Sequence, residues 1–168
     1  MKLLTLLIIF CFGLPVSLHA KPEPVKARLV LDRAQVVENK AFHVGVFFEI
    51  EPGWHIYWKD PGVAGLATEI KLTSSPEAAF TEIYWPEFKT FIQPGEIEGR
   101  GYEGEVLLYR GARLLKPSEN LSIKADVSWL ACNEVCVLGK TRLVESVAVG
   151  SEEKLANTEV YNQYKGKL

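Results

Sequence analysis

The stretch LSIKADVSW, residues 121–129, decides the fold, because apolar and polar side chains alternate along it without interruption. Every odd position is apolar and every even position is polar. A period of two is typical of a strand that has one face on a core and the other in water. The stretch therefore predicts a strand of an antiparallel sheet.

The same period recurs elsewhere in the chain. In residues 42–50 the even positions are all apolar. In residues 25–32 the odd positions are apolar, and Lys26, Arg28 and Asp32 lie between or after them. Residues 106–109 are continuously apolar, as in a more buried strand. Turn signals separate these segments: Glu51-Pro52-Gly53, Asp60-Pro61-Gly62, Ser74-Ser75-Pro76, Gln93-Pro94-Gly95 and Lys116-Pro117. Seven or eight short strands in about 130 residues predict an all-β fold, an immunoglobulin-like β-sandwich, with a polar tail or a short helix at the C-terminus.

The N-terminus predicts export. Residues 1–20 combine Lys2, an apolar run and small or helix-breaking residues before Ala20, which is the layout of a secretory signal peptide cleaved after Ala20. The alternative is an uncleaved anchor, but twelve apolar residues are too few for a bilayer, which needs about 20. No later stretch is long and apolar enough to cross a membrane. We expect a signal peptide at 1–20, one domain at 21–150 and a polar tail or short helix at 151–168.

The charge balance points away from two classes of partner. The chain has 19 Lys and Arg against 21 Asp and Glu, and removal of residues 1–20 takes away only Lys2. Neither sign dominates, so the sequence offers no electrostatic basis for binding nucleic acid or an anionic membrane.

Two cysteines remain after cleavage, Cys132 and Cys136, in the stretch SWLACNEVCVLGKTR, residues 128–142. The alternation before them puts Cys132 off the core face. In an extended chain their Cα atoms would lie about 13 Å apart, whereas a disulfide needs roughly 4.4–6.8 Å. The chain must therefore turn back within residues 133–135 or form a helical turn, and flanking strands favour a hairpin. Asn133 suits such a turn because Asn tolerates left-handed backbone angles.

Three roles for this pair remain open at this point. A stapling disulfide is the usual fate of paired cysteines outside the cytosol, but closing about five residues constrains the unfolded chain by only about 2 kcal/mol. A metal site would need further ligands, and His43 and His55 are distant in sequence. Two close thiols at an exposed tip can instead exchange with a partner's disulfide.

A second cluster, EPGWHIYWKDPGVAG, lies at residues 51–65. If it is a strand, Trp54, Ile56 and Trp58 share one face, and His55 and Tyr57 share the other. We expect Trp54 and Trp58 in the core. His55 and Tyr57 would make a catalytic pair only with a carboxylate to orient the histidine, and none stands at a fixed spacing.

Four blocks, GWHIYWKDPGVAGLATEI, YWPEF, GYEGEVLLY and WLACNEVCVLGK, occur in this order. Together they resemble the N-terminal periplasmic domain of the DsbD family of transmembrane disulfide reductases, and especially the similar domain of the copper-sensitivity suppressor ScsB. The resemblance covers residues 25–149. It implies an immunoglobulin-like fold with a redox-active cysteine pair, acting in the periplasm without a cofactor. The three-residue spacer is closer to ScsB, because the DsbD domain has a longer one.

The resemblance also implies roles for single residues. Cys132 and Cys136 would be the exchanging pair, with Cys136 forming mixed disulfides. The family shields its disulfide with an aromatic on a cap loop, and the matching segment WPEFKTFIQPG makes Phe88 the first candidate and Phe91 the second. His55 and Tyr57 would face the disulfide.

The implied activity is that of a protein-disulfide reductase-type exchange domain. Its partners would be a membrane-embedded disulfide reductase and oxidised periplasmic thiol–disulfide proteins. The chain stops at Leu168, so either the membrane-spanning and thioredoxin-like parts of the family are encoded separately or the domain is used alone. In either case its redox role would depend on a separate membrane partner. The alternative is an exported binding or scaffold module with a structural disulfide, or, with less support, a Cu(I)- or Zn-binding protein.

Overall fold

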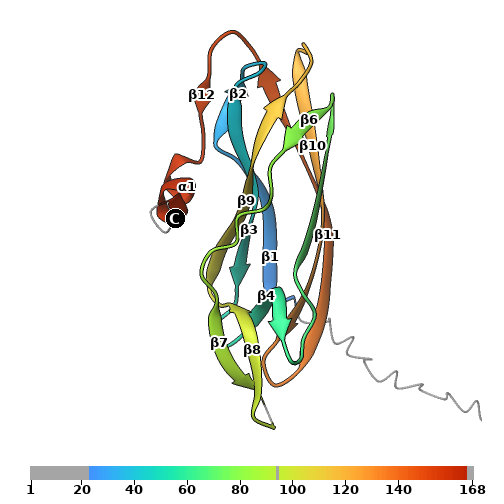
Figure 1. Ribbon diagram of the computed structural model, residues 1–168, viewed down its shortest axis with the longest axis vertical. Coiled ribbons are helices and arrows are strands. Elements are labelled where there is room, and N and C mark those ends of the chain that lie inside the picture. The colour runs from blue at the N-terminus through green and yellow to red at the C-terminus, as the bar shows by residue number, and fades with distance from the viewer. Residues whose placement is uncertain (1–22, 94, 166–168) are drawn as a thin grey trace, which may run out of the picture.

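The chain folds into an immunoglobulin-like β-sandwich (Figure 1). The computed structural model describes residues 23–93 and 95–165, so the predicted signal peptide lies outside the described residues. The smaller sheet has the order β1 (Val25–Leu31), β3 (Ala41–Ile50), β9 (Glu105–Leu114), β6 (Ala78–Phe80). The larger has the order β12 (Lys154–Leu155), β2 (Arg33–Val36), β11 (Cys136–Val149), β10 (Asn120–Cys132), β4 (His55–Gly62), β8 (Ile97–Tyr102), β7 (Lys89–Gln93).

Strand β10 is the centre of the larger sheet. It pairs with β11 along its whole length, while its other edge pairs first with β5 (Glu69–Ser75) and then, at its end, with β4. The predicted alternation is confirmed, because every odd residue from 121 to 129 is buried. This register fixes which face the end of β10 presents, and the candidate site lies there.

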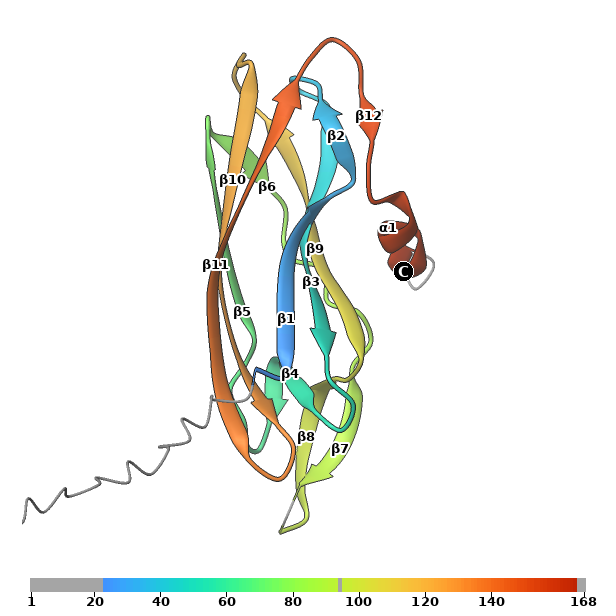
Figure 2. The same ribbon diagram turned by 180° about the vertical axis from the view of Figure 1, so that it is seen from behind.

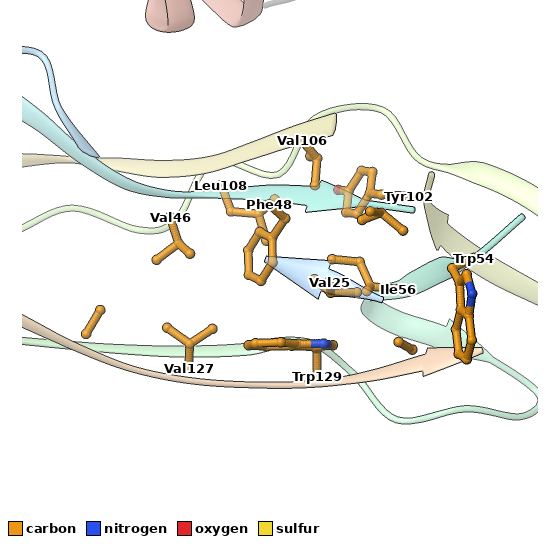
Figure 3. Packing of buried hydrophobic residues seen from close by; sticks show 13 residues of the cluster. Val25, Val46, Phe48, Trp54, Ile56, Tyr102, Val106, Leu108, Val127 and Trp129 are labelled. Atoms are coloured by element: carbon orange, nitrogen blue, oxygen red, sulfur yellow. The ribbon is translucent and has the colours of Figure 1, made fainter. Parts of the chain in front are cut away.

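The core fills the space between the sheets (Figure 3). Phe48 of β3 and Trp129 of β10 meet edge to face, with ring centroids 5.7 Å apart. Around them pack side chains from both sheets, among them Val46, Leu108 and Val127. Burial of this apolar surface is the main stabilising term of the fold.

The C-terminal tail carries a helix, α1 (Thr158–Lys165), which covers the outer face of the smaller sheet. In Figures 1 and 2 it lies beside β3 and β9, on the side away from β11. The Tyr161 hydroxyl donates to the carbonyl of Val30 (2.9 Å). The side chains buried there are Val30, Phe47, Leu107, Tyr109, Tyr161 and Tyr164. This helix explains the apolar run 106–109, since β9 is buried on both faces. No helix within the described residues has the length and apolar character needed to span a bilayer.

A buried carboxylate joins β3 to the start of β2. Asp32 is 1% exposed and accepts a hydrogen bond from the His43 backbone N–H (2.7 Å to Oδ1), and its Oδ2 forms an ion pair with Arg33 Nη1 (2.9 Å). The His43 Nδ1 lies 2.8 Å from Oδ2. Burial alone would raise the pKa of Asp32, but the hydrogen bonds from His43 and the charge of Arg33 outweigh it, so the pKa lies below its ordinary value.

Asp32→Asn is expected to lower the free energy of unfolding by about 1–2 kcal/mol at neutral pH, because it weakens charge-assisted hydrogen bonds to a buried group. A lowered folded-state pKa stabilises the fold fully above the unfolded-state pKa, and this stabilisation is lost as the pH falls through the folded-state pKa. The difference between wild type and variant should therefore shrink as the pH falls below about 3.9, the usual Asp value. Urea unfolding at pH 7 and pH 3 measures both effects. A difference that does not change with pH would contradict this account.

Candidate active site at the tip of a hairpin

The chain reverses between β10 and β11, and Cys132 and Cys136 are joined by a disulfide at the reversal. Their Cα atoms are 4.2 Å apart, so the predicted hairpin is confirmed. The predicted role of Asn133 is wrong in its mechanism, because Asn133 does not adopt a positive φ. Its side-chain oxygen instead accepts a hydrogen bond from the Val135 N–H (2.9 Å), while its own N–H donates to the Val135 carbonyl (3.0 Å).

The two cysteines differ sharply in exposure. Cys132 is 1% exposed, whereas Cys136 is exposed to solvent. Two apolar side chains beside Cys136 are also exposed, Val135 at 58% and Leu138 at 62%. A thiolate arriving from solvent can therefore reach Cys136 and not Cys132.

The strand register aligns three side chains across the larger sheet. Cys132 of β10 is the direct cross-strand partner of Cys136 on one side and of His55 of β4 on the other. Directly opposed residues of an antiparallel pair point to the same face. Since Trp129 and Ala131 point into the core, Cys132 and His55 lie on the outer face, as the sequence alternation predicted for both.

An aromatic cluster adjoins this row. The His55 ring stacks on Phe91 of β7, with centroids 3.9 Å apart, and meets the edge of Tyr57 at 5.2 Å. Tyr57 and Phe91 are 5.8 Å apart, and the Tyr57 hydroxyl donates to the Gln93 side-chain oxygen (3.1 Å). Of the predicted residues, the structure thus brings together Cys132, Cys136, His55, Tyr57 and Phe91.

Phe88 lies in a different environment. Its ring stacks on Trp58 at 4.5 Å, and both pack against the core between the sheets. Trp54 is buried in that core, as predicted. The first and second candidates for the shield are therefore separated, and Phe91 is the one that contacts a neighbour of Cys132.

Two glycines of β8 make the aromatic cluster possible, and the sequence analysis missed them. A Cβ on Gly99 would overlap the Phe91 ring, and a Cβ on Gly101 would overlap the backbone carbonyl of Ile56. Side chains from β7 can therefore cross β8 and reach β4. The signal for this in the sequence was the pattern GRGY at residues 99–102, because glycine inside a strand marks a close approach.

The loop between β4 and β5 closes over Tyr57. The Thr68 hydroxyl donates to the Tyr57 carbonyl (2.7 Å), and Gly65 lies against the Tyr57 ring with a φ of 117°, which favours glycine. Burial raises the pKa of Tyr57, and the hydrogen bond to Gln93 opposes this only in part, so the phenol is neutral.

His55 carries an unsatisfied polar atom. Its Nε2 is buried and has no hydrogen-bond partner among the described residues. Leaving a buried group unpaired costs about 1–3 kcal/mol, so such a group calls for an explanation. Burial lowers the pKa of His55, while the charge of Glu103 acts weakly in the opposite direction, so the imidazole is neutral near pH 7.

Within residues 23–93 and 95–165, no group of three or more His, Cys, Asp or Glu side chains is placed to hold a metal ion. The Cys132–Cys136 bond gives the arrangement the chemistry of a disulfide. This disulfide joins one exposed cysteine to one covered cysteine, and a neutral imidazole lies beside the covered one.

Comparisons with known proteins show what this chain is similar to. The family described as "Thiol:disulfide interchange protein DsbD, N-terminal" matches residues 24–148. The solved N-terminal periplasmic domain of ScsB from Proteus mirabilis is similar at 26% identity and a TM-score of 0.62, over 88% of this chain and 55% of that one. The reduced N-terminal domain of Neisseria meningitidis DsbD is similar at 16% identity and a TM-score of 0.48, over 77% of this chain and 89% of that one. No curated protein matches.

The family match covers most of the chain, including both cysteines and the GWHIYW block. The chain spans about half the length of the ScsB structure. The disulfide and the turn between its two cysteines lie within the matched region. This chain belongs to the family of DsbD N-terminal thiol:disulfide interchange domains.

Proposed function

We propose that this domain carries out thiol–disulfide exchange in the periplasm, passing electrons between a membrane-embedded disulfide reductase and oxidised periplasmic proteins. The observation that carries the proposal is the unequal exposure of the disulfide in a member of this family: Cys136 is open to solvent and Cys132 is covered. The predicted signal peptide and the periplasmic origin of the similar ScsB domain support the location.

The exchange runs in two displacements. A partner thiolate attacks Cys136 Sγ, the S–S bond breaks, and its electron pair leaves on Cys132 Sγ, which takes up a proton. The partner's second thiolate then attacks its own sulfur in the mixed disulfide and releases Cys136 as a thiol. The partner is oxidised and the domain is reduced by two electrons. The reverse sequence reduces the next protein.

A purely structural role has weaker support. Strands β10 and β11 pair along 13 residues, so the ladder already holds Cys132 and Cys136 opposite each other. Closing about five residues adds only about 2 kcal/mol. The disulfide therefore has little to stabilise, which favours a chemical use for it.

The aromatic cluster is proposed to shield the disulfide from other thiols. Phe91 supports this role better than Phe88, because Phe91 stacks on His55, the strand neighbour of Cys132, whereas Phe88 packs toward the core with Trp58. His55 and Tyr57 complete the wall on the β4 side.

The proposal predicts an exchangeable disulfide. Equilibration of the purified domain with glutathione buffers should give a reduction potential near or above roughly −230 mV, the range of exchange proteins. Reduction should cost no more than about 2 kcal/mol of unfolding free energy, from the small loop. A potential below about −300 mV, together with a large loss of stability on reduction, would establish a structural staple instead. The Cys132→Ala/Cys136→Ala double variant, which has no disulfide, supplies the baseline for the unfolding free energy.

A further inference from the structure

The covered cysteine has a chemical requirement that the exposed one lacks. When the disulfide opens, Cys132 Sγ carries the departing electron pair, and when the mixed disulfide is resolved, Cys132 must lose its proton before it can attack. Water cannot serve either step freely, because Cys132 is 1% exposed. A buried thiolate without a proton donor or a cation beside it is disfavoured.

His55 lies beside Cys132 and is placed to exchange this proton with it. It is the direct partner of Cys132 in the β4–β10 pair, and opposed residues of an antiparallel pair have Cβ atoms about 4.5–5.5 Å apart on the same face. Its Nε2 is buried and has no hydrogen-bond partner among the described residues, so no other described group competes with Cys132 for it. Stacking on Phe91 and edge contact with Tyr57 fix the ring.

We infer that His55 is the acid–base partner of Cys132, a role that rests on the proposed exchange function. As Cys132 attacks the mixed disulfide on Cys136, the neutral imidazole takes the Cys132 proton. The new Cys132–Cys136 bond forms, and the partner leaves as a thiolate with the electron pair of the broken bond. In the opposite direction the imidazolium returns the proton to the departing Cys132 sulfur. Such paired thiol and imidazole groups activate cysteines elsewhere.

The charged and titratable groups around His55 are consistent with this role. Glu103, after β8, favours the imidazolium, and its carboxylate is itself paired with Lys89 of β7 (3.1 Å). Tyr57 is neutral and bonded to Gln93. Glu134 lies in the turn between the cysteines. An imidazolium formed during exchange thus has a negative group within electrostatic range, while burial keeps the resting ring neutral.

The test measures the step in which Cys132 attacks the mixed disulfide on Cys136. The reduced domain reacts with oxidised glutathione, and acid-quenched samples are analysed by mass spectrometry for the protein–glutathione mixed disulfide. In His55→Phe, resolution of this intermediate should slow by at least about tenfold at pH 7, so that the mixed disulfide accumulates. The deficit should shrink toward pH 9, where hydroxide deprotonates Cys132 without help. Glu145→Gln, at an exposed position of β11 far from the disulfide, should retain the resolution rate and pH dependence of the wild type.

His55→Gln provides a second variant that keeps a polar side chain at the position, and it should behave as His55→Phe. Equal resolution rates in the wild type and both variants from about pH 5 to about pH 9 would overturn the inference. Failure to react with glutathione at all would count against the exchange function instead. In that event the pairing of His55 with Cys132 can still be tested by the thiolate absorbance of Cys132 near 240 nm. The absorbance is followed against pH in Cys136→Ala and in Cys136→Ala/His55→Phe. Loss of the imidazole should move its onset to higher pH, and an unchanged onset overturns the pairing.

Discussion

Cys136→Ala is expected to abolish the capture of redox partners in cells, whereas Cys132→Ala is expected to accumulate them as mixed disulfides. The reason is the unequal exposure of the two residues, since only Cys136 can meet a partner's sulfur and only Cys132 is placed to release it. Without Cys132 the mixed disulfide has no internal nucleophile and persists. The contrast should be close to all-or-none.

The measurement uses the full chain with its own N-terminus, acid quenching, alkylation of free thiols and non-reducing electrophoresis. Bands that appear with Cys132→Ala and vanish on reduction identify partners by mass spectrometry. The double variant Cys132→Ala/Cys136→Ala controls for non-covalent association. Capture by Cys136→Ala alone would assign the exchanging role to Cys132, and equal capture by both would show that exposure does not select the sulfur.

Local patterns in the sequence predicted several strands and the turn, but the seven or eight strands expected are fewer than the twelve in the described residues. The alternation in residues 121–129 predicted the core face of β10, and the spacing of the two cysteines required a reversal that the structure confirms. Both depend on neighbours within a few residues. The turn mechanism was missed because a side-chain hydrogen bond from Asn133 substitutes for a left-handed backbone.

Contacts between distant strands could not be predicted in the same way. Phe88 and Phe91 are three residues apart, and which of them approaches His55 depends on the pairing of β7 with β8 and of β8 with β4. That pairing in turn requires glycine at positions 99 and 101, where a Cβ would overlap atoms of the neighbouring strands. This requirement is visible only once the strands are assembled. The resemblance named both phenylalanines, and only the register separates them.

The sequence pattern also could not predict that α1 docks on the smaller sheet. The tail at 151–168 reads as polar, yet Tyr161 and Tyr164 bury their rings against the outer face of the smaller sheet. The apolar run at 106–109 signalled that β9 is covered on both sides, without indicating what covers it. An amphipathic pattern over only eight residues cannot distinguish a helix that docks on the sheet from a frayed chain end.

Gly139→Val is expected to destabilise the domain by about 3 kcal/mol, lowering the melting temperature by roughly 10 °C for a chain of this size. Gly139 is the cross-strand partner of Trp129, and a Cβ at Gly139 would overlap the indole ring. Trp129 is buried against Phe48 and cannot yield without opening the core. Lys140→Val introduces the same side chain at the next, exposed position and should change stability by no more than about 0.5 kcal/mol.

A double-mutant cycle tests the cause of that loss. If the clash with the indole is responsible, Gly139→Val should cost far less in a Trp129→Ala background, where the space is empty, although Trp129→Ala itself should cost about 3–5 kcal/mol. Equal costs in both backgrounds would attribute the effect to the strand backbone.

Trp129 lies three residues before Cys132 and Gly139 three residues after Cys136. The pair therefore locks the register of the hairpin that holds both cysteines, and its loss should weaken exchange as well as folding.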